Sequence, residues 1–442
     1  MRSFLKSVIS LRLKAATIIA ITVAVGCGTS APPVTEVPAP SLPTGLPTPS
    51  APGTTNTYNG GQSPGAWTMT LNNTGNSFTY QPVTYPVAAT SGSIQTGGGF
   101  SILGGAGLAY EVLGRAAVLR PASSATSPVF SVPQTSCYAI IGKLRFQYIA
   151  MFPGPLAAVI SAPPPLGYGS IVASTDTTGS TWQFENLQGN VVAGPAIFTA
   201  SCSGANGQAS ISFPGPSLLS EYWATSSGTS VNGPSTVTTT TPTTQSKLWI
   251  GPSGFFAADQ SDPTQTPYAG ASVAGMAEPS SALTTSALAA GEYLGFLYEA
   301  PVSSSVLSGA TAFTAPVGFG QVVPSSANTM TGGIFPNDDV TATPNSDIQI
   351  TLGTEDSTLN GLYPSASITV LDPDQNCANF TYFSLKGVAA SGVNANGYIT
   401  CTFPGVAVAG NPDGNYAIFV NSYNWAASLG GQPMEIFLFQ QQ

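Results

Sequence analysis

Short segments in which apolar and polar residues alternate recur along most of this 442-residue chain. The clearest is 137–150, where Phe146 and Tyr148 would lie on one face of an extended chain and Arg145 and Gln147 on the other. Because successive side chains of a β-strand point to opposite faces, this period of two predicts a strand with one buried face and one hydrated face. Similar runs lie at 67–72, 77–85, 108–120, 168–174, 180–185, 195–201, 208–213, 247–250, 347–352, 366–371, 379–386, 398–403, 415–420 and 434–440.

Clusters of Gly, Pro, Asn, Asp and Ser separate these runs, and the chain holds 49 glycines and 38 prolines. Asn206-Gly207 and Asp413-Gly414 are typical of tight turns between antiparallel strands. Many short strands joined by such turns favour antiparallel sheets that pack as a sandwich or close as a barrel. The sequence therefore predicts a mostly β fold.

One segment, 281–290, departs from the period of two. It is rich in Leu and Ala, stops before Gly291, and offers Ser280 or Ser281 as an N-cap. These are the usual start and stop signals of a helix. We expect one short helix here that covers a sheet.

Charged residues make up only 7% of the chain, and there is no histidine. Ten Lys and Arg against nineteen Asp and Glu cannot form the basic surface that a nucleic-acid binder needs. The lack of histidine excludes a Ser-His-Asp hydrolase, a His-ligated zinc enzyme and a His-based pH switch. No GxSxG or P-loop motif is present. We therefore predict no catalytic residue and no cofactor, and expect a protein that is not an enzyme.

The N-terminus has the pattern of an export signal. Four basic residues within the first fourteen positions precede the apolar segment 15–25. That segment is too short to cross a bilayer as a helix. A basic region followed by an apolar run of this length is typical of a secretory signal, which we expect to occupy residues 1–26.

The segment Val23-Ala24-Val25-Gly26-Cys27 resembles the lipobox of bacterial lipoproteins, although Ala24 stands where Leu, Val or Ile is usual. The resemblance covers only about the first 27 residues. It implies that the Cys27 thiol receives a diacylglycerol and that its freed amine receives a further acyl chain such as palmitate. Two or three acyl chains anchor a protein stably. Gly28, rather than Asp, follows the cysteine, which points to the outer membrane. The alternative is an ordinary secretory signal with an incidental cysteine.

Residues 27–65 read as a tether. Eight prolines lie between positions 32 and 52, interleaved with Ser, Thr, Ala and Gly. Such a segment cannot bury a core and is expected to sample extended polyproline II conformations. At about 3.1 Å per residue it would reach on the order of 100 Å when fully extended.

The rest of the chain divides at a Ser- and Thr-rich stretch, 224–246. We predict it to be a linker between two β domains, 66–223 and 247–442, each of ordinary domain size. The alternative is a long hairpin inside a single larger domain.

Four cysteines remain after Cys27: Cys137, Cys202, Cys377 and Cys401. Four cysteines in an exported chain permit three pairings. The simplest is Cys137 with Cys202 and Cys377 with Cys401, because it places one disulfide in each predicted domain. Metal binding by thiolates is the rival interpretation, but the chain has no CxxC pair and an oxidising compartment favours disulfides.

Acidic residues are the remaining candidates for chemistry. A glycosidase needs two carboxylates facing each other across a cleft, and the spacing of Asp338-Asp339 and Glu355-Asp356 does not indicate one. Asp372 and Asp374 resemble the start of a calcium loop, but the glycine and glutamate that an EF-hand requires further along are missing. A looser calcium site and an Asx-rich turn stay as alternatives there. Five tryptophans are candidates for sugar stacking, although core packing is their commoner use: Trp67, Trp182, Trp223, Trp249 and Trp425.

Together these features predict an exported, lipid-anchored cell-envelope protein with a β-rich body that binds a ligand or partner or plays a structural role. Its expected partners are the membrane, through the lipid at Cys27, and a glycan, small molecule or protein. Two alternatives stay open. One is a carboxylate-based enzyme acting on polysaccharide, and the other is an adhesin or surface-layer component.

Overall fold

A computed structural model of the chain places residues 1–39 and 40–442 in two separate units, and everything described below belongs to the second unit. The described residues are 45–46, 55–62, 65–72, 77–80, 83–86, 94–96, 100–103, 107–121, 128–151, 166–186, 197–203, 208–214, 222–224, 230–232, 243–261, 269–299, 318–336, 342–372, 389–390, 399–424 and 432–441.

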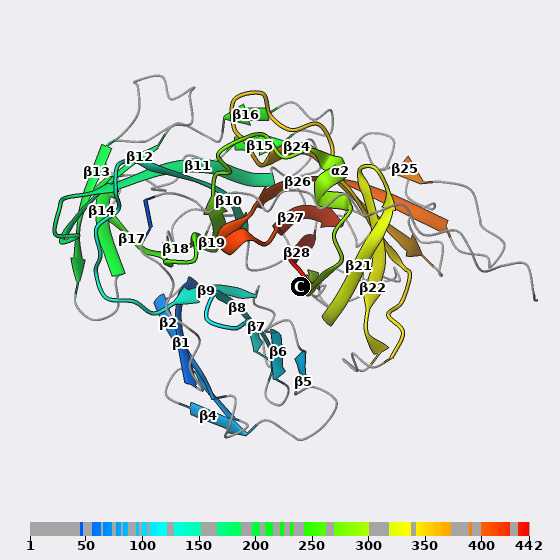
Figure 1. Ribbon diagram of the computed structural model, residues 1–442, viewed down its shortest axis with the longest axis horizontal. Helices are drawn as coiled ribbons and strands as arrows, with labels where there is room; N and C mark the ends of the chain where they lie inside the picture. The colour runs from blue at the N-terminus through cyan, green and yellow to red at the C-terminus, as the bar shows by residue number, and fades with distance from the viewer. Residues whose placement is uncertain are drawn as a thin grey trace, which may run out of the picture. The chain divides into compact units, whose positions relative to one another are not determined.

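These residues form three antiparallel sheets, labelled by strand in Figure 1. The mostly β, antiparallel fold predicted from the sequence is therefore confirmed. The first sheet contains β1 (Thr55–Gln62), β2 (Gly65–Asn72), β3 (Ser77–Tyr80), β4 (Val83–Pro86), β5 (Ile94–Thr96), β6 (Phe100–Leu103), β7 (Gly107–Val112), β8 (Ala116–Pro121) and β9 (Val129–Pro133). Its order is β4-β3-β2-β1-β9-β8-β7-β6-β5, so two runs of hairpins join where β1 pairs with β9.

The second sheet closes on itself. It contains β10 (Leu144–Met151), β11 (Leu166–Thr175), β12 (Thr181–Asn186), β13 (Ile197–Ser203), β14 (Gln208–Pro214), β15 (Tyr222–Ala224), β16 (Ser230–Asn232), β17 (Thr243–Ile250), β18 (Phe255–Ser261) and β19 (Ala269–Ala277). Its order is β10-β19-β18-β17-β14-β13-β12-β11-β15-β16, and β10 also pairs with β11. That pairing completes a ring of strands, the barrel form of the predicted fold.

The third sheet is built in the same way. It contains β20 (Tyr293–Glu299), β21 (Gly318–Ser326), β22 (Thr329–Ile334), β23 (Ile348–Thr351), β24 (Leu362–Asp372), β25 (Ala389–Ala390), β26 (Ile399–Gly410), β27 (Ala417–Asn424) and β28 (Gln432–Gln440). Its order is β24-β23-β22-β21-β20-β28-β27-β26-β25, with β24 also paired to β26. The turn between β26 and β27 is a 3-10 turn at Pro412–Gly414, where Gly414 has a φ of +79°. The turn predicted at Asp413-Gly414 is thus present, whereas Asn206-Gly207 lies outside the described residues.

The predicted linker at 224–246 does not separate two sheets. β17 begins at Thr243, inside that segment, and pairs along its length with β14 from the first predicted domain. β10 and β19, which come from opposite sides of the linker, also pair with each other. Backbone pairing thus joins the two predicted domains in one sheet, as in the alternative of a single larger domain.

The predicted tether extends too far toward the body. β1 begins at Thr55, within the segment 27–65, and pairs with both β2 and β9. Tyr58 of this strand is fully buried, although its neighbours in sequence are small and polar. The eight prolines between positions 32 and 52 suggested the tether, only Pro64 follows them within the segment, and the hairpin partner that makes β1 a strand is not visible locally.

The single described helix, α2 (Thr285–Ala289), lies within the predicted segment but starts later. Its N-cap is Thr284, whose hydroxyl accepts a hydrogen bond from the Ala287 amide at 3.2 Å, rather than Ser280 or Ser281. Just before the helix, the Leu283 amide donates a hydrogen bond of 3.0 Å to the Glu355 carboxylate. Leu288 is buried, as expected for a helix that covers a sheet.

β10 is buried on both of its faces, which corrects the expectation that Gln147 is hydrated. Phe146, Gln147 and Tyr148 are all fully buried. Gln147 lies in register with Ser170 of β11 and with Met276 of β19. A Cβ at Gly410 would lie 2.8 Å from the Met276 sulfur, so this face of the second sheet packs against the third.

A cluster of aromatic rings joins all three sheets. Phe130 of β9 in the first sheet lies 5.8 Å from Phe255 of β18 and 5.0 Å from Phe419 of β27, measured between ring centroids. Phe255 and Phe419 are themselves 6.0 Å apart, so one ring from each sheet contacts the other two. Tyr110 of β7 adds a ring contact to Phe439 of β28 and donates a hydrogen bond to the Leu294 carbonyl. The main apolar core therefore runs through all three sheets.

We predict that the protein loses stability steeply above pH 10. Burial raises the pKa of Tyr58, Tyr110, Tyr293 and Tyr363 above the usual value of 10. A raised folded-state pKa leaves stability intact below the unfolded pKa, and the stability is lost as the pH rises beyond it, because only the unfolded tyrosines ionise. Each such tyrosine costs about 1.4 kcal/mol per pH unit in that range.

Urea unfolding at pH 8, 9.5, 10.5 and 11 measures this loss. The Tyr110→Phe variant should show a shallower decline, since one titrating group is removed. A free energy of unfolding that stays constant up to pH 11 would contradict the prediction.

Candidate functional site

The loop 134–143, between β9 and β10, is fixed to the ring of the second sheet by several unlike contacts. Cys137 forms a disulfide with Cys202 of β13. The ring of Tyr138 packs edge-on against Trp182 of β12 at 5.4 Å, and its hydroxyl donates to the Ile250 carbonyl at 2.8 Å. The loop is therefore attached to three strands of the closed second sheet, β12, β13 and β17.

The turn between β11 and β12 is shaped to receive this loop. A Cβ at Gly179 would lie 2.2 Å from the Tyr138 carbonyl carbon, and Gly179 has a φ of +71°, so only glycine fits. Partial loss of hydration acts to raise the pKa of Asp176, but hydrogen bonds from Ser180, Thr181 and Thr178 outweigh it and lower that pKa to about 2. The turn thus carries a fixed negative charge at all ordinary pH values.

The predicted disulfide between Cys137 and Cys202 is confirmed. Cys401 of β26 is also disulfide-bonded. Its predicted partner, Cys377, lies outside the described residues, as does the predicted lipidation site Cys27.

A buried carboxylate, which sequence reasoning missed, lies in the first sheet. Glu111 of β7 is fully buried and accepts a hydrogen bond of 2.5 Å from the Tyr58 hydroxyl. Asn56 donates to the same carboxylate oxygen at 3.0 Å, and the Gly114 amide donates to the Tyr58 hydroxyl at 2.9 Å. Burial first, and then the Glu111 charge, raise the pKa of Tyr58. These contacts tie β1 to β7.

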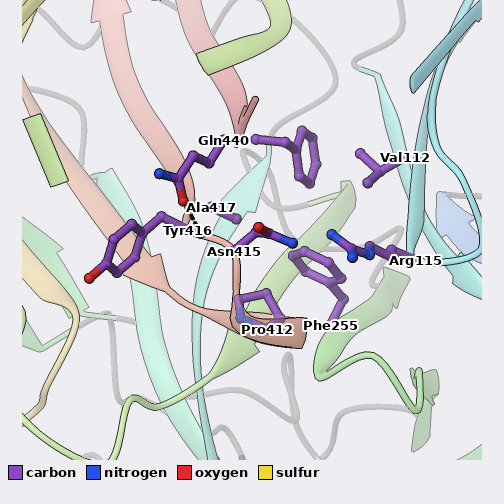
Figure 2. A pocket seen from close by; sticks show the side chains of 9 residues that line it. Val112, Arg115, Phe255, Pro412, Asn415, Tyr416, Ala417 and Gln440 are labelled. Atoms are coloured by element: carbon purple, nitrogen blue, oxygen red, sulfur yellow. Dashed lines mark hydrogen bonds between the residues drawn. The ribbon is translucent and has the colours of Figure 1, made fainter. Parts of the chain in front are cut away.

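A small notch opens where the three sheets meet, and Figure 2 shows its lining. Arg115 comes from the turn between β7 and β8, Phe255 from β18, and Asn415 and Tyr416 from the turn before β27. Arg115 and Asn415 extend toward each other across Phe255 in Figure 2. The cavity volume of about 10 Å³ is near the lower limit for one water molecule. The notch offers polar groups to solvent but no room for an enclosed ligand.

The acidic pair Glu355-Asp356 accepts hydrogen bonds from backbone amides. Glu355 accepts from the Gly361 amide at 2.6 Å and from Leu283, which precedes α2, and Asp356 accepts from the Thr358 amide at 2.8 Å. These bonds shape the segment between β23 and β24 and tie it to the chain before α2. Glu278 accepts from the neighbouring Asn360 amide at 3.0 Å.

The other acidic candidates do not form a site in the described residues. Asp372 is the last residue of β24, in register with Ile399, whereas Asp338, Asp339 and Asp374 lie outside the described residues. Among the residues described, no three Cys, Asp or Glu side chains group as metal ligands.

Two tryptophans are core residues. Trp182 and Trp249 are buried, with Trp182 donating its indole N–H to the Gly179 carbonyl at 2.9 Å. The side chains of Trp67, Trp223 and Trp425 lie outside what the structure describes.

Comparison of the chain with protein-family models, with curated proteins and with solved structures finds no match. No helix in the described part of the chain is long and apolar enough to cross a bilayer.

We predict that loss of the Cys137–Cys202 disulfide lowers the free energy of unfolding by about 4 kcal/mol. The two cysteines are 65 residues apart, and closing a loop of that length restricts the unfolded chain by about this amount. Chemical denaturation of the Cys137→Ser, Cys202→Ser double variant measures the loss. Ser136→Ala, an exposed neighbour in the same loop, serves as a control and should change little. Equal stability of the double variant and the wild type would contradict the prediction.

We also predict that Gln147→Met raises the free energy of unfolding by about 1 kcal/mol. Neither amide atom of the buried Gln147 has a hydrogen-bond partner among the described groups, nor does the Ser170 hydroxyl beside it. A buried polar group without a bond costs about 1–3 kcal/mol, and Met has nearly the same shape without that cost.

The matched control is Gln183→Met in β12, where the side chain is exposed and the change should stay within about 0.5 kcal/mol. A clear loss of stability in Gln147→Met would instead mean that its amide is hydrogen-bonded in solution.

Proposed function

We propose that this protein is an exported, lipid-anchored component of a bacterial cell envelope that presents a rigid β-rich body for partner binding or a structural role. The observation that carries the proposal is the order of features in residues 1–27. Basic residues, a short apolar run and the lipobox-like segment ending in Cys27 follow each other as they do in bacterial lipoproteins.

The disulfides support export. Cys137–Cys202 fastens a loop to a closed ring of strands, and Cys401 is also disulfide-bonded. Structural disulfides persist in oxidising compartments such as the periplasm and the cell surface, and they are rare in the cytosol.

The charge of the body supports a lipid anchor over electrostatic membrane binding. Beyond residue 26 the chain has six Lys and Arg against nineteen Asp and Glu. A surface with this balance is repelled by anionic lipid headgroups, so its protein surface alone would not hold it at a membrane.

At the notch, the described residues leave no room for an enclosed small ligand, which favours a protein partner or a structural role for this part of the body. The notch among the three sheets has room for about one water molecule, and the buried groups beside it are aromatic rings that pack on each other. Ligand pockets for small molecules are usually about 300–1,000 Å³. The described residues instead build one continuous apolar core, which holds the three sheets in fixed positions relative to one another.

We predict that Cys27→Ser releases the protein from the membrane fraction. Without the thiol no diacylglycerol can be attached, and the variant should neither incorporate radiolabelled palmitate nor sediment with membranes. The measurement is labelling and fractionation of cells that express the wild type or the variant. The control Thr29→Ser, two residues further on, should keep both label and location.

Unchanged fractionation and gel mobility of Cys27→Ser would overturn the lipid anchor. A wild-type mature N-terminus that mass spectrometry finds without acyl chains would show an ordinary secretory signal instead.

A further inference from the structure

We propose that the Pro-rich tether does not run freely to the body but is strapped, at Gly45 and Leu46, to the disulfide-held loop 134–143. The strap leaves only residues 28–44 to span the distance from the lipid anchor. The contact itself is independent of lipidation, but its consequence for reach rests on the proposed anchor at Cys27.

The two segments are joined by backbone and apolar contacts. The Ile141 amide donates a hydrogen bond of 2.9 Å to the Gly45 carbonyl. Leu46 is partly buried and packs against the main apolar core.

Gly45 fits the contact because it lacks a side chain. Its φ of +114° lies in a region that other residues rarely adopt, and a Cβ there would lie 2.8 Å from the Ile141 carbonyl oxygen. The two backbones therefore approach more closely than a larger residue would permit. Gly45 is therefore required by this close backbone contact and does not simply make the Pro-rich segment flexible.

The loop that receives the strap is held directly before the contact, and β10 begins soon after it, at Leu144. Cys137 is covalently bound to Cys202, and the Ile140 amide donates to the Thr175 hydroxyl at 2.7 Å. The Ile141 side chain is 81% exposed, so this residue contributes its backbone and not its apolar surface. The loop therefore holds the Ile141 amide in a fixed position, where it donates its hydrogen bond to the Gly45 carbonyl.

The strap changes how far the body stands from the membrane. A free segment of residues 28–44 reaches about 50 Å at 3.1 Å per residue, against about 80 Å for residues 28–54, which end where β1 begins.

Hydrogen exchange of the full-length protein in detergent tests the contact directly. In the wild type, peptides that contain the Ile141 amide should exchange slowly. In Gly45→Val, which clashes with the Ile141 carbonyl, the same amide should exchange at least tenfold faster, and limited proteolysis should cut within 40–54 at least tenfold faster. Thr35→Val, in the stretch left free, is the matched control and should match the wild type in both measurements.

Leu46→Ser is the second variant, because it removes the apolar contact without backbone strain and should shift exchange in the same direction. Protection of β9 and β18 in every variant reports that the body stays folded. Equal exchange at Ile141 in the wild type and both variants would overturn the strap. Palmitate labelling of the same samples decides the anchor separately, so failure of one proposal is distinguishable from failure of the other.

Discussion

The contact of three phenylalanine rings, Phe130, Phe255 and Phe419, is the interaction on which the rest of the body depends. Each ring comes from a different sheet and touches the other two. Two of these sheets close into rings of strands. In isolation, each closed sheet would bury only its inner face and would leave the apolar residues of its outer face in water. The aromatic contact covers those faces, and it explains why residues such as Gln147 and Met276 are buried on what would be the outside of an isolated ring. The boundary predicted at 224–246 fails for another reason, because β14 and β17 pair across it within the second sheet.

Alternation of apolar and polar residues predicted strands such as β12, where Trp182 is buried and Gln183 is exposed. It also predicted β11 and β27, although polar residues of these strands, such as Ser170 and Asn421, are buried as well. The same reasoning missed β18 to β22, where small residues or two buried faces remove the alternation. β19 is an example: Gly275 lies so near the neighbouring strand that a Cβ would be 2.5 Å from the Gln147 carbonyl oxygen. For the candidate sites, the count of cysteines left three pairings open, and the predicted pair Cys137–Cys202 is confirmed although the domain division that favoured it is not. No local signal could place Glu111 beside Tyr58 or Gly45 beside Ile141, since these contacts join segments far apart in the chain.

The scarcity of charge takes on a physical meaning in this fold. A body with so few charged groups relies on shape, buried rings and disulfides for its stability rather than on ion pairs. Arg145 and Glu278 form an ion pair at 3.3 Å that is partly exposed. Such a pair contributes little, about 0–1 kcal/mol. In the lipid-anchored protein that we propose, the contact at Gly45 limits how far this weakly charged body stands from the membrane.

The central claim is that the three sheets fold as one unit through their shared aromatic core. Unfolding of the mature protein in urea, followed by site-resolved hydrogen exchange, tests it most directly when the wild type is compared with Phe130→Ala. The account predicts one transition in which β9, β18 and β27 lose protection together. It predicts that the variant shifts that single transition in all three sheets, by about 3–5 kcal/mol for a buried phenylalanine. A variant that destabilises only the first sheet, with β18 and β27 unfolding at their original urea concentration, would contradict it.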